Sequence, residues 1–298
     1  MTPISSNKSD PEEIKQHAKI LFNRISKELD YGIRKLPSFP PIAKRVGDLI
    51  KDPNYKARDL IEVLEGDKKL SERLVKISSS SLYPGKEQCD QLGAAVRRMG
   101  ADTTRNLVLM YSLDAVFRSD KRLAQQKLKQ LWAKSAKLSA IAYWIATYSV
   151  SFKSEAALLA GLLQDVGSLY IVSTMSEKAK SEYHWQLVDQ MLEDYSTEMT
   201  IKILNHWQIS EEIITCAKTK DNWMRNGNDR ADLADLMTIA RYHSYLNTDK
   251  IRECPKFSNM PCVAKVKMRK PDMTPFQGLK IVNESKEAIS DIARMLVV

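Results

Sequence analysis

The residues that could bind a metal or act as nucleophiles are few in this chain and widely spaced. No two of its histidines have HxxxH spacing and none has HxxE spacing, so no helix face offers a ready pair of metal ligands. The phosphate-binding, dinucleotide-binding and serine-hydrolase motifs GxxxxGK[ST], GxGxxG and GxSxG are also absent. The residue types therefore predict no catalytic residue and no metal site. The four histidines are His17, His184, His206 and His243.

Cysteine and serine add no catalytic signature. The cysteines fit neither a zinc ribbon nor a disulfide framework, which favours reduced thiols in a cytoplasmic protein. The run from Ser78 to Ser81 is typical of a helix end, because serine disfavours helix interiors. The N-terminus is polar, and the longest uncharged run, 138–152, is shorter than the ~20 residues of a membrane span. We therefore expect a cytoplasmic location without membrane insertion. The cysteines are Cys89, Cys216, Cys254 and Cys262.

The formal net charge of +9 is concentrated in two regions. Residues 118–137 carry seven basic and one acidic side chain, and residues 251–280 carry seven basic and two acidic ones. The rest of the chain is slightly acidic. The lysines of the first region spread over one half of a helical wheel opposite leucines, as on a solvated helix face. Aromatic residues do not alternate with these bases, so single-stranded nucleic acid is not the favoured partner.

Apolar residues recur with helical spacing along most of the chain, and glycine is scarce at 10 of 298 residues. Both features predict an all-α fold. Asp10 and Pro11 mark the first helix start, and Gly100 marks a helix end. Residues 251–273 have three prolines and no clear period, which favours an irregular basic arm. The expected helices are 11–29, 42–50, 60–64, 70–77, 92–99, 102–117, 121–150, 155–163, 166–172, 185–192, 198–207, 211–218, 232–246 and one starting at Thr274-Pro275-Phe276-Gln277.

Three segments together resemble the HDOD domain, a bacterial signalling module related to the HD phosphohydrolases. They are Leu36-Pro37-Ser38-Phe39-Pro40, the stretch from Asp67 to Tyr83, and Ala95-Val96-Arg97-Arg98-Met99-Gly100 followed by Thr104-Arg105-Asn106-Leu107-Val108. Trp132, the segment 161–167 and the segment 207–212 then follow in the family's order. The resemblance implies a two-lobed helical bundle with an HD-like second lobe. The expected organisation is an N-terminal extension 1–30, an HDOD domain 31–230 with lobes 31–117 and 118–230, and C-terminal helices 231–298.

The resemblance also indicates where the metal ligands of an HD phosphohydrolase would stand. Gln164-Asp165 corresponds to the His-Asp pair, Lys134 to an upstream histidine, and Lys220-Asp221 to a later His-His pair. An amide is a poor substitute for imidazole, and an ammonium repels a divalent cation. Asp165 alone cannot hold a catalytic metal, so we expect no cofactor. Asp165 is either a relic ligand, a contact for a small signal, or the cap of the next helix, which we favour.

These features favour a non-catalytic regulatory protein that binds a protein partner or a small signal molecule. Two alternatives remain: a divergent metal-dependent phosphohydrolase acting on nucleotides, and a nucleic-acid-binding regulator using residues 118–137 and 251–280. Several basic side chains could contact an anionic partner or could simply be solvated. They are Arg73, Arg97, Arg98, Arg105, Lys127, Lys129 and Lys134.

Overall fold

The computed structural model describes residues 10–38, 40–52, 54–80, 83, 89–117, 119–176, 181–269 and 286–296. The secondary structure of these residues is helical, apart from one isolated bridge between Ser149 and Met268. The all-α prediction is therefore confirmed.

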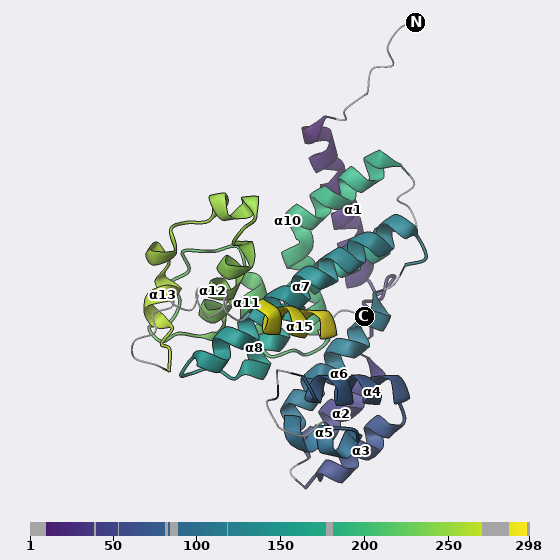
Figure 1. Cartoon of the computed structure of the whole chain (residues 1–298). Helices are drawn as coiled ribbons and strands as arrows, with labels where there is room; N and C mark the ends of the chain where they lie inside the picture. The colour runs from purple at the N-terminus through teal and green to yellow at the C-terminus, as the bar shows by residue number, and fades with distance from the viewer. Residues whose placement is uncertain are drawn as a thin grey trace, which may run out of the picture.

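The first six helices form a long N-terminal helix and a group of five shorter ones. The five shorter helices, α2 to α6, pack against one another and form the lower part of Figure 1. Asp10 caps the first helix by accepting the N–H of Glu12, and Gly100 ends α5 with a φ of 79°, which favours glycine. The helices are α1 (Pro11–Asp30), α2 (Pro41–Lys51), α3 (Ala57–Glu65), α4 (Lys68–Ser78), α5 (Leu92–Met99) and α6 (Ala101–Val116).

Helix α7 is the longest of the remaining helices and contacts α8, α9, α12 and α15. Helix α10 packs between α9 and α1. Just after α10, the indole Nε1 of Trp207 donates a 2.8 Å hydrogen bond to the carbonyl of Pro37, which ties this part to the segment before α2. The helices are α7 (Arg122–Tyr148), α8 (Ser154–Leu163), α9 (Val166–Met175), α10 (Glu182–His206), α11 (Glu211–Lys218), α12 (Leu233–Tyr245) and α15 (Lys286–Leu296).

Helix α10 is one continuous helix, so the prediction of two helices at 185–192 and 198–207 was wrong. Its middle carries the buried polar residues Ser196 and Thr200 beside the apolar Met199. These small polar side chains lie at the contact with α9, where the hydroxyl of Thr200 accepts the N–H of Gly167 at 2.9 Å. The hydrophobic period is broken there because the close approach of α9 requires small side chains.

The prediction of an irregular arm from 251 to 273 is corrected for residues 251–269. This stretch contains the 3₁₀ helices η1 (Asp249–Glu253) and η2 (Phe257–Asn259) and the short helix α13 (Pro261–Lys265). Phe257, Met260 and Cys262 are buried, and α13 packs on α12. These three buried side chains follow no regular spacing, but their packing keeps the segment ordered. The remainder of the arm and the helix start at Thr274-Pro275 lie outside the described residues.

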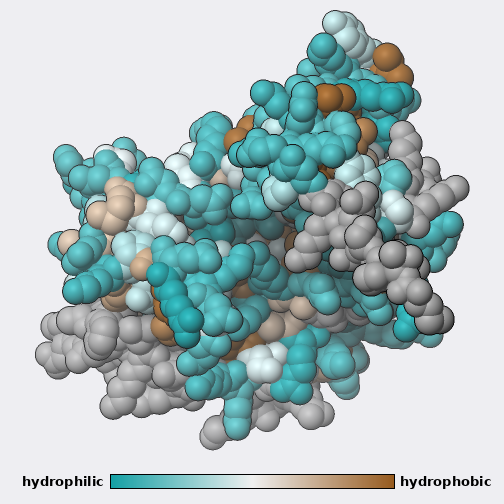
Figure 2. All heavy atoms as spheres, turned by 90° about the horizontal axis from the view of Figure 1, so that it is seen from above, coloured by the Kyte–Doolittle hydropathy of each residue, from teal (hydrophilic) through white to brown (hydrophobic). Residues whose placement is uncertain are grey.

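One helical stretch, Ser154–Met175, is long and apolar enough to cross a membrane. However, 83% of its most apolar window is buried inside the protein, so we interpret it as the core pair α8 and α9. Figure 2 shows a mostly hydrophilic face with small, separate hydrophobic patches. Among the described residues, the large apolar side chains that remain exposed are scattered, as on ordinary protein surfaces. They are Ile20, Tyr31, Ile33, Leu123, Val150 and Met224.

Candidate functional site

The Gln164-Asp165 pair forms the junction between α8 and α9, and two glycines fix its position. A Cβ atom on Gly161 would lie 2.4 Å from the Cα of Ser139 on α7. A Cβ atom on Gly167 would lie 2.4 Å from the Ser196 carbonyl oxygen on α10. Glycine at both positions therefore lets α8 approach α7 and lets α9 approach α10, which places the junction between these two long helices.

A lysine from another part of the chain forms an ion pair with the carboxylate of Asp165. The ammonium of Lys220, which follows α11, lies 2.7 Å from the Asp165 Oδ1 atom. The same oxygen accepts the hydroxyl of Ser168 at 2.9 Å, and Lys220 also donates to the Ser196 hydroxyl at 3.2 Å. The Lys220 side chain is only 8% exposed. A buried ammonium thus neutralises the carboxylate that the HD motif would use as a metal ligand.

An arginine engages Gln164 in the same way. Gln164 is buried, and its Oε1 atom accepts a hydrogen bond from the guanidinium of Arg241 on α12. Arg241 is itself buried. An amide oxygen suits this arrangement because it accepts from the arginine without adding a second negative charge. Two cationic side chains therefore contact the Gln-Asp pair.

The donor set at this junction does not fit a divalent metal ion. Such an ion needs free lone pairs from several carboxylates or imidazoles, whereas Asp165 and Gln164 accept hydrogen bonds from cations that would repel it. In the described part of the chain, no three His, Cys, Asp or Glu side chains cluster as metal ligands would.

The structure brings together three of the five positions identified by the resemblance: Gln164, Asp165 and Lys220. Lys134 is exposed on α7, and Asp221 is exposed beyond Lys220. The expected capping role of Asp165 is corrected. Asp165 occupies the N-cap position of α9, but its carboxylate accepts no backbone N–H of that helix.

No sequence motif indicated Arg241, because it lies outside the segments that resemble the HDOD domain and outside the two basic regions. The one available signal was a single charge within the apolar stretch 236–241 of α12. A charged residue at a buried helix position usually has a specific partner.

The seven basic residues named as candidate contacts divide into two groups. Three interact within the protein: Arg73 lies over the ring of Tyr111 at 5.3 Å, Arg98 donates to the carbonyl of Ser78, and Lys127 pairs with Asp189 and lies over Trp185. The other four are exposed and lie on α5, α6 and α7. They are Arg97, Arg105, Lys129 and Lys134.

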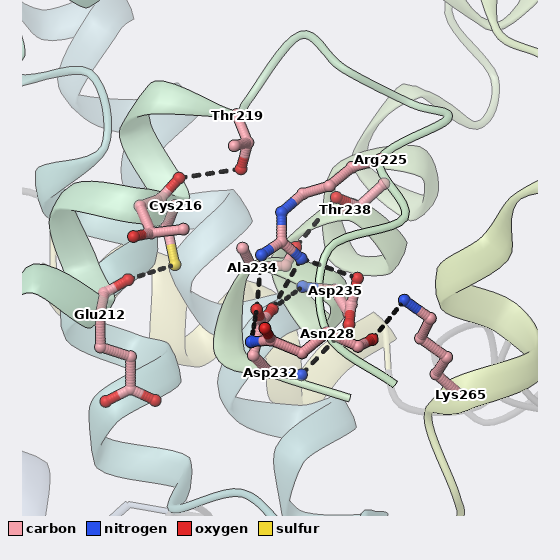
Figure 3. A network of polar contacts seen from close by, with 11 residues as sticks. Glu212, Cys216, Thr219, Arg225, Asn228, Asp232, Ala234, Asp235, Thr238 and Lys265 are labelled. Carbon is pink, nitrogen blue, oxygen red and sulfur yellow. Dashed lines mark hydrogen bonds and ion pairs between the residues drawn. The ribbon is translucent and has the colours of Figure 1, made fainter. Parts of the chain in front are cut away.

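An arginine network holds the loop that joins Lys220 to α12. Figure 3 shows the guanidinium of Arg225 between Asp232 and Asp235, at the start of α12. Burial opposes ionisation of Asp232, but hydrogen bonds from Arg225 and from the backbone hold its pKa below the ordinary value. For Asp235, burial dominates and raises the pKa. Lys265 closes the network by donating to the Asn228 carbonyl at 2.7 Å.

His243, two residues after Arg241, makes stability depend on pH. Burial lowers its pKa from 6.5 to about 4, although a hydrogen bond to the Ile239 carbonyl opposes this shift. In the unfolded chain the imidazole of His243 takes up a proton near pH 6.5, whereas in the folded protein it is protonated only near pH 4. The stabilisation is therefore complete above pH 6.5 and is lost as the pH falls toward 4.

We expect His243→Gln to remove up to about 1.4 kcal/mol per pH unit from the dependence of unfolding free energy on pH in this range. Urea unfolding at several pH values measures the slope. The exposed His206 supplies the control His206→Gln, which should keep the wild-type slope. Equal slopes in wild type and His243→Gln would contradict the prediction.

Comparison with known proteins decides the family. The HDOD domain family matches residues 36–223, well over half of the chain. This chain belongs to the HDOD family. A curated relative, an uncharacterised protein of Treponema pallidum (strain Nichols), is 21% identical over 204 residues. That alignment covers 64% of this HDOD chain but only 38% of the relative's length.

Solved structures share the fold of this HDOD protein. An HDOD domain protein of unknown function from Geobacter sulfurreducens gives a TM-score of 0.66 at 20% identity, covering 96% of this chain and 98% of its own. A protein from Shewanella amazonensis SB2B, whose name suggests a metal-dependent phosphohydrolase, gives a TM-score of 0.69 at 17% identity. The match covers 94% of this chain and 98% of that protein. A protein from Marinobacter aquaeolei VT8, named for signal transduction, gives a TM-score of 0.61 at 18% identity. The match covers 98% of this chain and 67% of that protein. At these identities the likeness shows a common fold.

Proposed function

We propose that this HDOD protein is a non-catalytic bacterial regulator that acts by binding a protein partner or a small signal molecule in the cytoplasm. The observation that carries the proposal is the pairing of Lys220 with Asp165 and of Arg241 with Gln164. These contacts place fixed positive charge where an HD phosphohydrolase holds its metal.

Two further features support the proposal. Lys220 and Arg241 come from different elements and are largely buried, so they belong to the packed structure rather than to a solvated surface. Moreover, a buried charge is costly unless it is paired. The folded protein should therefore retain these pairs rather than exchange them for a metal.

The domain organisation that we propose follows from the same family. An HDOD domain of residues 31–230 would carry the lobes 31–117 and 118–230, with the extension 1–30 before it and residues 231–298 after it. The packing of α2 to α6 as one group supports the division between the lobes. Exposed Arg97 and Arg105 on the first lobe, and Lys129 and Lys134 on the second, are the proposed contacts for an anionic partner.

Metal analysis tests the absence of phosphohydrolase activity. The protein would be purified in the presence of Mn²⁺, its metal content measured by mass spectrometry, and hydrolysis of bis-p-nitrophenyl phosphate followed. We expect less than stoichiometric metal and the same background hydrolysis in wild type and Asp165→Asn. Stoichiometric metal together with hydrolysis that disappears in Asp165→Asn would establish the phosphohydrolase alternative instead.

A salt titration separates the regulator from a nucleic-acid binder. Nucleic-acid affinity carried by phosphate contacts falls steeply with salt, because counterions are released on binding. We expect no salt-sensitive binding of a labelled duplex or single strand in fluorescence anisotropy. Tight binding that weakens in Lys129→Glu would favour the nucleic-acid alternative.

A further inference from the structure

A cavity of about 630 Å³ lies between α7, α12 and α15, apart from the Gln164-Asp165 junction. Arg241 and His243 stand two positions apart on α12, so they point to nearly opposite sides of the helix. Arg241 contacts Gln164, whereas His243 lines the cavity. The other lining residues are Ala133, Lys137, Ile141, Leu246, Asn247, Lys286, Ile289, Ser290, Ala293 and Arg294.

The cavity combines an apolar wall with positively charged side chains. Large apolar side chains in the wall come from Ile141 on α7, Leu246 just after α12 and Ile289 on α15. Within the described part of the chain, every charged residue that lines the cavity is basic, and Lys137 and Lys286 are exposed to solvent. The volume lies within the roughly 300–1,000 Å³ range of small-molecule sites, which are also mainly apolar with a few polar groups.

His243 adds an unsatisfied polar group to the wall. Its Nδ1 atom lies 2.7 Å from the Ile239 carbonyl oxygen, so Nδ1 carries the proton and donates it. The Nε2 atom is then an acceptor, and it has no hydrogen-bond partner among the described residues. A buried acceptor without a partner is unfavourable.

We propose that this cavity binds a small amphipathic organic anion. The apolar body would pack against Ile141, Leu246 and Ile289, and the anionic group would lie near Lys137 and Lys286. Charge complementarity selects an anion, because none of the described residues that line the cavity is acidic. The site does not depend on the loss of metal chemistry at Asp165, so it stands or falls separately from the regulatory role.

Fluorescence of 8-anilinonaphthalene-1-sulfonate, an apolar anion, tests the proposal on the full chain. We expect saturable binding of one probe per chain, displaced by decanoate at much lower concentration than by the neutral 1-decanol. Lys137→Glu should weaken probe binding by about tenfold, as expected for the loss of one favourable charge contact. Ala133→Trp should abolish binding by filling the cavity.

Arg122→Glu is the matched control, because Arg122 is exposed on the same helix and does not line the cavity. It should leave probe binding unchanged. Far-UV circular dichroism and the urea midpoint confirm that each variant is folded. If Ala133→Trp does not fold, Lys137→Glu, a change at an exposed position, decides the result. Absence of saturable binding, equal binding in wild type and Lys137→Glu, or equal displacement by decanoate and 1-decanol would overturn the proposal.

Discussion

Gly161→Ala is expected to lower the free energy of unfolding by about 3 kcal/mol, the upper part of the range for overpacking a well-packed core. The added Cβ would lie 2.4 Å from the Cα and 2.8 Å from the backbone nitrogen of Ser139. Backbone atoms cannot rotate away as a flexible side chain can, so α8 must move away from α7. Urea denaturation followed by circular dichroism measures the change.

Gly47→Ala provides the matched control, because Gly47 also lies within a helix, α2, and a Cβ there meets nothing within 4 Å. Alanine is the better helix former, so this variant should be more stable than wild type by roughly 0.5–1 kcal/mol. Opposite signs for the two variants would show that the close helix crossing, and not helix propensity, governs Gly161. Similar effects in both variants would contradict this explanation.

Lys220→Met should cost about 2–3 kcal/mol, somewhat below the cost of breaking a fully buried ion pair, because Asp165 retains some contact with water. Methionine keeps the length and apolar stem of lysine but leaves Asp165 without its cation and Ser196 without its donor. Chemical denaturation at pH 7 measures the loss.

Two further variants separate the ion pair from the packing of the stem. Lys218→Met removes an ion pair with Glu211 in which both side chains are largely exposed, so it should change stability by less than about 0.5 kcal/mol. The double variant Lys220→Met with Asp165→Asn should recover part of the loss, because the uncompensated charge is gone. A double variant no more stable than Lys220→Met alone would argue against an ion pair.

Much of the fold could be predicted because local physical chemistry determines helices. Asp10 with Pro11, and Gly100, mark one helix start and one helix end in the sequence and in the structure. Helix α12 begins one residue after the predicted start, at the capping box of Asp232 and Asp235. Such signals act within a few residues, so the sequence reveals them directly.

The sequence-based predictions failed where packing between distant segments, and not the local hydrophobic pattern, determines the structure. Ser196 and Thr200 are buried in the middle of α10, although they are small polar residues that no hydrophobic period would select. Residues 251–269 are ordered because Phe257, Met260 and Cys262 are buried, although their spacing follows no helix or strand. In both cases the stabilising contact lies with another element of the chain.

The sequence by itself determined the helical class, the HDOD family pattern and the loss of imidazole at position 164. It also placed a lysine at position 220, but it could not say what that lysine contacts. Only the tertiary structure pairs Lys220 with Asp165 and brings Arg241 to Gln164. The pairs join residues 55 and 77 positions apart, and their distances depend on how α8, α9 and α12 pack. Residue type follows from the sequence alone, whereas the electrostatic partner of a buried charge is set by the packing of the whole chain.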